Sequence, residues 1–516
     1  MTHRIYLAGF LGITAGLLAF NLSAEDTIVL ANGQSIAGAI LKNTPSELIV
    51  RVDGAEMVLK RAQLKSINGK PVDDAAPAKQ GQPTKAAPTV ASVPTIPSAN
   101  ELAKLLNDYD EFLRTAPDSR TEKAPGSAFT NLTKQGAESW RKALWTAWAR
   151  RMQELKSKQP PLPPDQDTQD AKRVHSANSA RKTEDTVLSG EFKMKYTWEQ
   201  VGQPPQKGWP LYINLHGGGD NTALNDDQWR IAQKRVTISC GIFLCPRAPV
   251  DSIIGWDEPA FYRTLEQLIK EFIALHGVDS DRIYLLGYSM GGWGAFHIGP
   301  TFADRWAAVE ASAGGGTPQA SPPMNLRNTP FMIQIGSLDN DFQRRPLAKA
   351  FSEALEKLHA DDLDGYTFVY KEHEGKGHQI DDSDAPKWLE QFTRNPIPEK
   401  LVWKEPEGNC GYGKVRGNQL TRDQFAWLAV EKANPGEKVV GARHKNEIQL
   451  DMSTPQRLTI FLDDRMADLD QPVIVRSGGK EVFNARPARS VSALLHALFL
   501  HGDPELLFCS EIHVNQ

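Results

Sequence analysis

Residues 282–291 read RIYLLGYSMG, an apolar run that leads directly into a G-x-S-x-G turn. The apolar run is typical of a buried strand, and residues of helical character follow the serine at once. A serine at such a strand-to-helix corner sits in a strained turn, with its hydroxyl pointing out of the sheet edge. Glycines flank it because a side chain there would clash with the neighbouring strand and helix. The stretch therefore predicts that Ser289 is a nucleophile at the end of a central strand.

Strands and helices alternate on both sides of this stretch. Apolar runs of strand length occur at residues 211–215, 241–245, 331–335 and 366–370, and an amphipathic helix is expected over 261–276. Strands separated by helices predict a largely parallel sheet covered on both faces. We therefore expect an α/β catalytic domain over residues 186–398.

A serine hydroxyl needs a base, a group that orients the base, and donors for the oxyanion that forms. Residues 216–219 read HGGG and follow a buried strand. A glycine run at this place lets backbone N–H groups point at a substrate carbonyl. The N–H groups of Gly218 and Met290 are therefore the expected oxyanion hole, with a glycine-rich surface turn as the alternative.

The acid and the base are expected at the ends of later strands, in the chain order serine, acid, histidine. Asp339 is the leading candidate for the acid, and Asp341 is the alternative. His378 follows the next strand and is favoured over His373 as the base. His378 would take the proton of Ser289 and return it to the leaving group, while Asp339 would hold the imidazole in the right tautomer.

These motifs resemble the α/β-hydrolase superfamily, in particular secreted esterases of the dienelactone-hydrolase-like, polyhydroxybutyrate-depolymerase-like or "predicted peptidase" type. The resemblance implies a Ser289–Asp339–His378 triad and a hole formed by Gly218 and Met290. It covers less than half of the chain and departs from the usual pattern at residues 340–342, which leaves the choice of acid open. The motifs that carry it are LHGGG at 215–219, GYSMGGWG at 287–294, GSLD at 336–339 and GH at 377–378.

Two aromatic residues are candidates for the substrate pocket. Trp256 lies in the segment GWDEP at 255–259, on the loop before the expected helix. Its ring could stack on an aromatic or sugar group, or it could pack on the edge of the domain. Tyr288 precedes the nucleophile and is expected to pack beneath or beside it.

The N-terminal residues 1–24 have the pattern of a signal peptide. A short basic start precedes an uncharged apolar run over 5–20, and small residues precede Glu25. This pattern predicts export to the periplasm or the cell exterior, with an uncleaved membrane anchor as the alternative.

The rest of the chain divides by composition into four more regions. Asn-Gly and Asp-Gly turns between apolar runs predict a small SH3-like or Sm-like β-barrel over 25–69. Residues 70–98 are rich in Ala, Pro, Gln and Lys and are typical of a flexible linker. Residues 99–185 are helical or irregular, and their aromatic stripe at Trp140, Trp145 and Trp148 is typical of packing. Residues 399–516 predict a separate β-rich domain.

Composition limits the partners and cofactors. The net charge of −4 in 516 residues argues against a dominant nucleic-acid function. The spacing of the four cysteines is not that of a zinc site, and Cys410 and Cys509 could pair or remain buried thiols. We expect no metal or organic cofactor, and no membrane contact beyond the signal peptide. The sequence leaves the oligomeric state open.

Together these features predict an exported serine hydrolase that cleaves carboxylic esters, small or polymeric, through an acyl-enzyme intermediate. One alternative is a serine peptidase of the prolyl-oligopeptidase type on the same fold. The other is a binding or scaffold protein whose hydrolase domain has lost activity.

Overall fold

The structure is a computed structural model, and the residues it describes form two compact units. One unit holds residues 1–8 and 91–516, and the other holds residues 9–90. The described residues are 4–6, 26–30, 35–43, 47–52, 55–60, 64–67, 70–71, 96–115, 123–158, 180–189, 192–253, 255–407, 421–453 and 457–514.

The larger unit is built on a nine-stranded sheet with the order β1-β15-β14-β13-β12-β10-β11-β9-β8. The strands from β11 to β15 pair in parallel, whereas β8, β9 and β1 are antiparallel to their neighbours. This is the expected α/β-hydrolase-like fold with a mostly parallel sheet. Its strands are β8 (Ala180–Ser189), β9 (Phe192–Val201), β10 (Trp209–Leu215), β11 (Gly241–Pro246), β12 (Val278–Tyr288), β13 (Ala308–Ser312), β14 (Phe331–Gly336), β15 (Phe368–His373) and β1 (Arg4–Tyr6).

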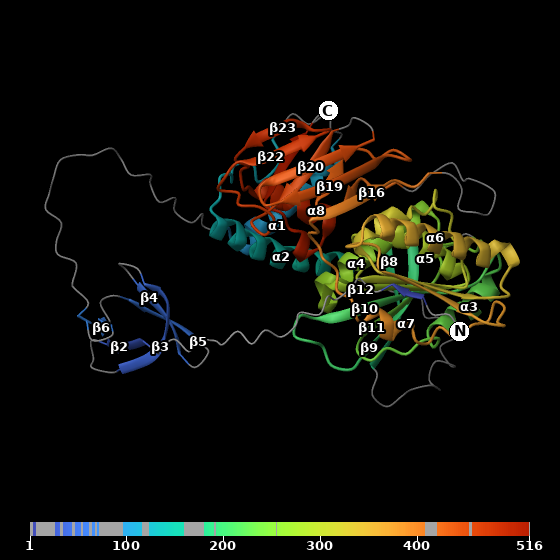
Figure 1. Ribbon diagram of the computed structural model, residues 1–516. Helices are drawn as coiled ribbons and strands as arrows, with labels where there is room; N and C mark the ends of the chain where they lie inside the picture. Colours follow the sequence, from blue (N-terminus) through green and yellow to red (C-terminus); the bar gives the residue numbers. More distant parts are fainter. Residues whose placement is uncertain are drawn as a thin grey trace. The chain divides into compact units, whose positions relative to one another are not determined.

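Helices cover both faces of this sheet because alternate residues of each buried strand point to opposite sides. On β10, Leu211 and Ile213 pack in one core with residues of α4, α5 and α6, while Tyr212 packs in a second core with residues of α3 and α7. Figure 1 shows α4, α5 and α6 together on one side of the sheet. The helices are α3 (Thr222–Ala232), α4 (Pro259–His276), α5 (Met290–Thr301), α6 (Arg344–Asp361) and α7 (Ala385–Leu389).

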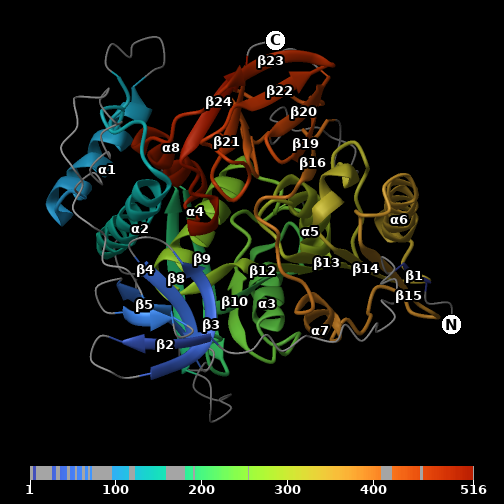
Figure 2. The ribbon, with the colours of Figure 1, turned by 60° about the vertical axis from the view of Figure 1, so that its left-hand side comes forward.

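Two helices that come before β8 in the sequence pack against other helices of the larger unit. They are α1 (Ala99–Arg114) and α2 (Lys134–Ser157), and both contact α8 (Val491–His501) near the other end of the chain. Figure 2 shows α1 and α2 beside α8. Trp140 and Trp148 of α2 are buried in the same core as the sheet, so this aromatic stripe serves packing.

Two further sheets follow the parallel one. The first has the order β16-β19-β20-β22-β23 and the second the order β17-β18-β21-β24. Their strands are β16 (Lys400–Lys404), β17 (Gln424–Phe425), β18 (Leu428–Val430), β19 (Lys438–His444), β20 (Glu447–Met452), β21 (Leu458–Leu462), β22 (Val473–Ser477), β23 (Lys480–Ala485) and β24 (Ser510–Val514). Their core residues belong to the same apolar cluster as the core under α4, α5 and α6.

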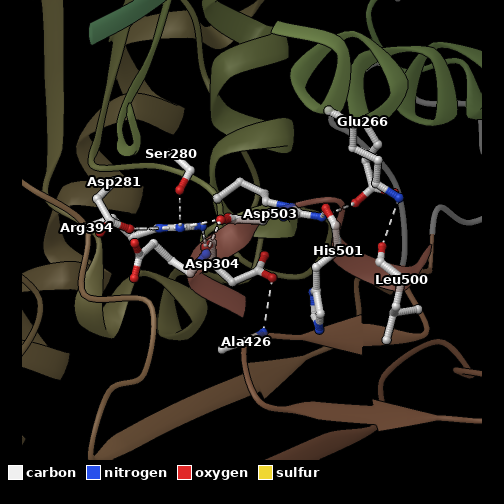
Figure 3. Close-up of polar contacts among 12 residues, drawn as sticks. Glu266, Ser280, Asp281, Asp304, Arg394, Ala426, Leu500, His501 and Asp503 are labelled. Carbon is white, nitrogen blue, oxygen red and sulfur yellow. Dashed lines mark hydrogen bonds and ion pairs between the residues drawn. The ribbon is translucent and has the colours of Figure 1, made fainter. Parts of the chain in front are cut away.

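A network of buried charges joins these C-terminal sheets to the parallel sheet (Figure 3). Arg394 bridges Asp281 and Asp503 with distances of 2.8 Å to each carboxylate. Arg422 contacts Glu266 of α4 at 2.9 Å and also pairs with Asp304. We call this set the interface network; its cations are Lys270, Arg305, Arg394 and Arg422, and its anions are Glu266, Asp281, Asp304 and Asp503.

The smaller unit holds an antiparallel sheet in the order β5-β4-β3-β2-β6-β7 around a small apolar core. The sheet agrees with the strands expected over 25–69, and its likeness to SH3 or Sm modules stays a prediction. The strands are β2 (Asp26–Leu30), β3 (Ser35–Asn43), β4 (Glu47–Val52), β5 (Ala55–Lys60), β6 (Leu64–Ile67) and β7 (Lys70–Pro71).

Two features bear on the expected export. β1 lies in the segment expected to be a signal peptide and pairs with β15 at the edge of the sheet. Within the described ranges, no helix has the length and apolar character needed to cross a bilayer.

Cys240, Cys245 and Cys509 are thiols. Cys410, the possible partner of Cys509, lies outside the described residues.

Candidate active site

Ser289 lies at the corner between β12 and α5, with a backbone conformation of φ 60° and ψ −116°. This conformation is rare for a residue with a side chain, and such strain is typical of functional sites. The turn is closed by a hydrogen bond of 3.0 Å from the Ser289 N–H to the carbonyl of Ser312 on β13. This hydrogen bond therefore holds the strained corner against the neighbouring strand β13.

Glycines let the corner form because backbones approach closely at two positions. A Cβ on Gly291 would lie 2.0 Å from the carbonyl oxygen of Leu215, and one on Gly292 would lie 2.1 Å from that of Ser312. No side chain fits at such distances, so α5 packs tightly against the ends of β10 and β13. This close packing holds Ser289 at the carboxyl edge of the parallel strands.

The structure brings Ser289, His378 and Asp339 into one chain of hydrogen bonds. The Oγ of Ser289 lies 2.9 Å from Nε2 of His378, and Nδ1 of His378 lies 2.8 Å from Oδ2 of Asp339. Asp339 is an acceptor, so Nδ1 carries the proton in the neutral imidazole and Nε2 faces the serine as an acceptor. This arrangement lets the imidazole take the hydroxyl proton during an attack by Oγ.

Asp339 is buried and is held from a second side by Arg344, the first residue of α6. The Arg344 guanidinium donates to both carboxylate oxygens at 2.6–3.0 Å. Burial alone would raise the pKa of Asp339, but hydrogen bonds from His378 and Arg344 outweigh burial and hold this pKa below its ordinary value. The carboxylate is therefore ionised at neutral pH, as an orienting acid must be.

The two alternative residues lie elsewhere. Asp341 is exposed and begins a short 3₁₀ turn, η5 (Asp341–Gln343). The ring of His373 contacts the Gln334 side chain at 3.0 Å, in a hydrogen bond between β15 and β14. The geometry thus joins Asp339 and His378, rather than these alternatives, to Ser289.

The loop that carries His378 is fixed by contacts from β12 and from the segment after α3. The Tyr288 hydroxyl donates to the His378 carbonyl at 2.7 Å, and the Arg235 guanidinium lies over the Tyr288 ring at 3.4 Å. Arg235 also pairs with Asp382, four residues beyond the histidine, at 2.9 Å. Tyr288 is buried, so the structure places it beneath the histidine loop, where it positions the base.

The proposed oxyanion donors lie on the turn after β10 and at the start of α5. Gly218 has φ 148°, and a Cβ there would lie 1.9 Å from Oδ1 of Asn225. Asn225 braces this turn by accepting from the Gly219 N–H at 2.8 Å and donating to its carbonyl at 2.9 Å. Met290 is the first residue of α5, where N–H groups lack intrahelical acceptors and the helix dipole favours negative charge.

His216 and Trp256 form the support behind this turn. Burial lowers the pKa of His216 to about 4, so the ring is neutral, and its Nε2 accepts from the Ala248 N–H at 2.8 Å. Trp256 is only 1% exposed and donates its indole N–H to the His216 carbonyl at 3.0 Å. The sequence left open whether Trp256 stacks on a substrate or packs on the domain, and these contacts favour the packing role.

Three residues of the site carry no sequence signal that could have found them. Arg344, Arg235 and Asn225 each act through a contact with a residue that the motifs do identify. A guanidinium or amide at these positions has no fixed spacing from its partner, because the fold and not the local sequence brings them together. The motifs and the order of strand ends mark Ser289, Asp339 and His378 in the sequence, but they do not mark these three contacts.

The arrangement provides a nucleophile, a base, an orienting carboxylate and a glycine turn at one edge of the sheet. It is therefore suited to acyl transfer through a serine ester. Among the residues that the structure describes, no group of three or more His, Cys, Asp or Glu side chains could hold a metal ion.

Comparisons with known proteins give matches only among solved structures; no protein-family model and no curated protein matches the sequence. A thermostable esterase is 20% identical, covering 41% of this chain and 63% of its own, with a TM-score of 0.33. An S-formylglutathione hydrolase from Agrobacterium tumefaciens is 18% identical, covering 42% and 99%, with a TM-score of 0.31. A protein described as a dipeptidyl aminopeptidase IV from Bacteroides ovatus is 14% identical, covering 41% and 35%, with a TM-score of 0.31. Over 41–42% of its length, the chain is thus similar to esterases and hydrolases of the α/β-hydrolase type.

Proposed function

We propose that this protein is a serine hydrolase that cleaves carboxylic esters through an acyl-enzyme intermediate. The observation that carries the proposal is the hydrogen-bonded chain from Ser289 through His378 to Asp339, with distances of 2.9 and 2.8 Å. The strained backbone of Ser289 supports it, because strain of this kind is typical of nucleophiles at strand-to-helix corners.

In the first half of the reaction, Oγ of Ser289 attacks the ester carbonyl carbon while Nε2 of His378 takes its proton. The carbonyl oxygen becomes an oxyanion, which the N–H groups of Gly218 and Met290 would stabilise; one such donor is worth about 3–4 kcal/mol. The intermediate then expels the alcohol, which leaves with the proton held by His378. The product of this half is an acyl ester on Ser289.

In the second half, water attacks the acyl ester and His378 takes the proton of the water. The second tetrahedral intermediate collapses, the carboxylic acid leaves, and the proton returns to Ser289. Throughout both halves, Asp339 stabilises the imidazolium without accepting its proton.

Covalent labelling tests the proposal directly. A fluorophosphonate probe should label the wild-type chain, and Ser289→Ala should abolish the labelling, because only an activated serine reacts with the phosphorus. Labelling that persists in Ser289→Ala would place the nucleophile elsewhere. A folded wild-type chain that takes no label would instead favour a scaffold role.

Turnover of two substrate classes distinguishes an esterase from a peptidase. We expect hydrolysis of p-nitrophenyl acetate and little turnover of dipeptide amides. The reverse preference would favour the peptidase. A panel of esters with varied acyl and alcohol parts would then define the substrate.

We also propose that the chain is exported, on the basis of the apolar run over residues 5–20 and the small residues that follow. The test is N-terminal sequencing of the protein recovered from fractionated bacterial cells. A mature chain in the exported fraction that begins at Glu25 supports export, whereas an intact N-terminus in the membrane fraction would favour the anchor.

A further inference from the structure

Arg344 makes an unusually complete contact with the candidate catalytic acid. Its Nη2 donates to Oδ1 of Asp339 at 2.6 Å, and its Nε lies 2.9 and 3.0 Å from Oδ1 and Oδ2. Oδ2 is the oxygen that also faces Nδ1 of His378. The side chains of Arg344 and Asp339 are 7% and 1% exposed, so water screens this ion pair poorly. One buried carboxylate therefore serves an imidazole and a guanidinium at once.

The backbone between the two residues is strained in a way that brings them together. Phe342 and Gln343 both have positive φ, 53° and 58°, although neither is a glycine. Each such residue costs about 1–3 kcal/mol and persists only where the surrounding structure over-determines it. This turn allows α6 to begin at Arg344, only five residues after Asp339. The guanidinium thus reaches the acid from the first turn of a rigid helix.

We infer that Arg344 is a positioning residue for the proposed hydrolysis: it fixes the plane of the Asp339 carboxylate and partly neutralises the charge that this carboxylate presents to His378. The inference rests on the proposed function. Two consequences follow from the geometry. A fixed carboxylate holds the imidazole aimed at Ser289, and a partly neutralised carboxylate attracts the imidazolium less strongly.

The other charged and titratable groups near Arg344 and Asp339 belong to other residues, so a substitution at Arg344 does not remove them. The ring of Tyr288 on β12 lies tilted against the His378 ring, with their centroids 5.4 Å apart, and Arg235 with its partner Asp382 lies behind Tyr288. A change in pH dependence can therefore be assigned to the guanidinium.

The experiment measures the rate of fluorophosphonate labelling against pH for wild type, Arg344→Gln, Arg344→Lys and Arg345→Gln. Arg345→Gln is the matched control, because the side chain of this neighbour pairs with Glu372 at 2.9 Å and not with Asp339. The probe needs no knowledge of the natural ester. Circular dichroism and a thermal melt establish that each variant is folded.

For Arg344→Gln, we expect labelling to slow by up to about 10²-fold, since a displaced catalytic group can cost that much. We also expect the acidic limb of its pH profile to move to higher pH, because the carboxylate then attracts the imidazolium more strongly. Arg344→Lys keeps the charge but cannot bridge both oxygens. It should therefore label more slowly than wild type with an acidic limb close to that of wild type, whereas Arg345→Gln should match wild type in both.

A folded Arg344→Gln that matches Arg345→Gln in rate and pH profile would overturn the inference. Should Arg344→Gln fail to fold, Arg344→Lys decides: slower labelling with an unchanged acidic limb supports the inference, and wild-type labelling overturns it. If the folded wild type takes no label at any pH, the proposed function itself fails. These outcomes separate the two statements.

Discussion

Ser289 adopts a conformation that the surrounding glycines make possible and that the neighbouring strands maintain. Its positive φ would relax if α5 moved away from β10 and β13, but Gly291 and Gly292 let the helix backbone sit against carbonyls of those strands. Close packing at Gly291 and Gly292 therefore maintains the strained conformation of Ser289. This coupling makes the glycines as important to the site as the serine.

The change Gly291→Ala tests this coupling. Its Cβ would lie 2.0 Å from the Leu215 oxygen, a backbone atom that cannot move aside. We expect a loss of about 1–3 kcal/mol or more in the free energy of unfolding. We also expect slower probe labelling, because the helix must shift away from the oxyanion turn. Urea unfolding and labelling rates measure the two effects.

Gly377→Ala is the matched control for stability. Apart from its two neighbours in the chain, no described residue has an atom within 4 Å of the place that its Cβ would take, and the φ of Gly377 is outside the left-handed region. Its free energy of unfolding should stay within about 0.5 kcal/mol of wild type. Equal stability of the two glycine variants would refute the close-packing argument.

The sequence could predict the residues of the site that follow a rule of chain order. Ser289, Asp339 and His378 each come at the end of a strand, and parallel strands present their carboxyl ends at one edge. Arg344 follows no such rule, because its role depends on two left-handed residues that have no glycine to mark them. The sequence left Trp256 open between stacking on a substrate and packing on the domain edge, and the fold shows the indole buried behind His216.

At the scale of single elements, the parallel sheet followed from the alternation of apolar runs and helices. The sequence also indicated α1, α2 and the C-terminal strands. It did not indicate that these strands form two sheets, or that the core of these sheets is continuous with the core under α4. Contacts between segments that are distant in the sequence do not change the hydrophobic periodicity of either segment.

Glu405, directly after β16, gives a prediction about pH. Burial raises the pKa of Glu405 to about 8, although the Arg422 N–H and the Trp403 indole donate to its carboxylate. An ordinary pKa near 4.5 in the unfolded chain means that folding takes up a proton between these values. Stability from this group is full below the unfolded pKa and is lost as pH rises towards 8.

Replacing Glu405 by Gln removes the titration and keeps one of the two acceptor oxygens, while the amide nitrogen faces the other donor at every pH. The melting temperature of Glu405→Gln should therefore fall less between pH 5 and pH 8 than that of wild type. Glu481→Gln, at a partly exposed position, serves as the control and should follow wild type. A Glu405→Gln variant with the wild-type pH dependence would contradict the assignment.

At the scale of the whole molecule, the interface network joins the hydrolase-like sheet to the C-terminal sheets. Four cations face four anions in the set defined above, and most of them are buried. His501 is enclosed beside this set, and burial and the neighbouring cations hold its pKa well below the ordinary value, so it adds no charge. The balance of charge in the interface network therefore depends both on residues near the parallel sheet and on residues near the C-terminal sheets.

Arg394→Met tests the energetic role of this network. The change removes the nearer of the two cations that face the Asp503 carboxylate, which is 0% exposed: Arg394 lies at 2.8 Å and Arg305 at 3.7 Å. Removing one member of a buried pair costs about 3–5 kcal/mol. We therefore expect a large decrease in the free energy of unfolding, measured in urea.

The control is Arg476→Met, which removes a side chain that is 35% exposed and 3.7 Å from Glu481. An exposed pair of this kind contributes about 0–1 kcal/mol. If both variants lost equally little stability, the interface network would not hold the two sets of sheets together.

The same network has a consequence for protein engineering. A fragment that ended at residue 398 would retain Glu266, Asp281 and Asp304 but lose Arg422 and Asp503, so that Asp304 would lack its cation and Arg394 one of its two carboxylates. Charges stranded in this way would face newly uncovered apolar surface, a combination that promotes precipitation during recombinant expression. A shortened form of the protein for recombinant production should therefore include the C-terminal sheets.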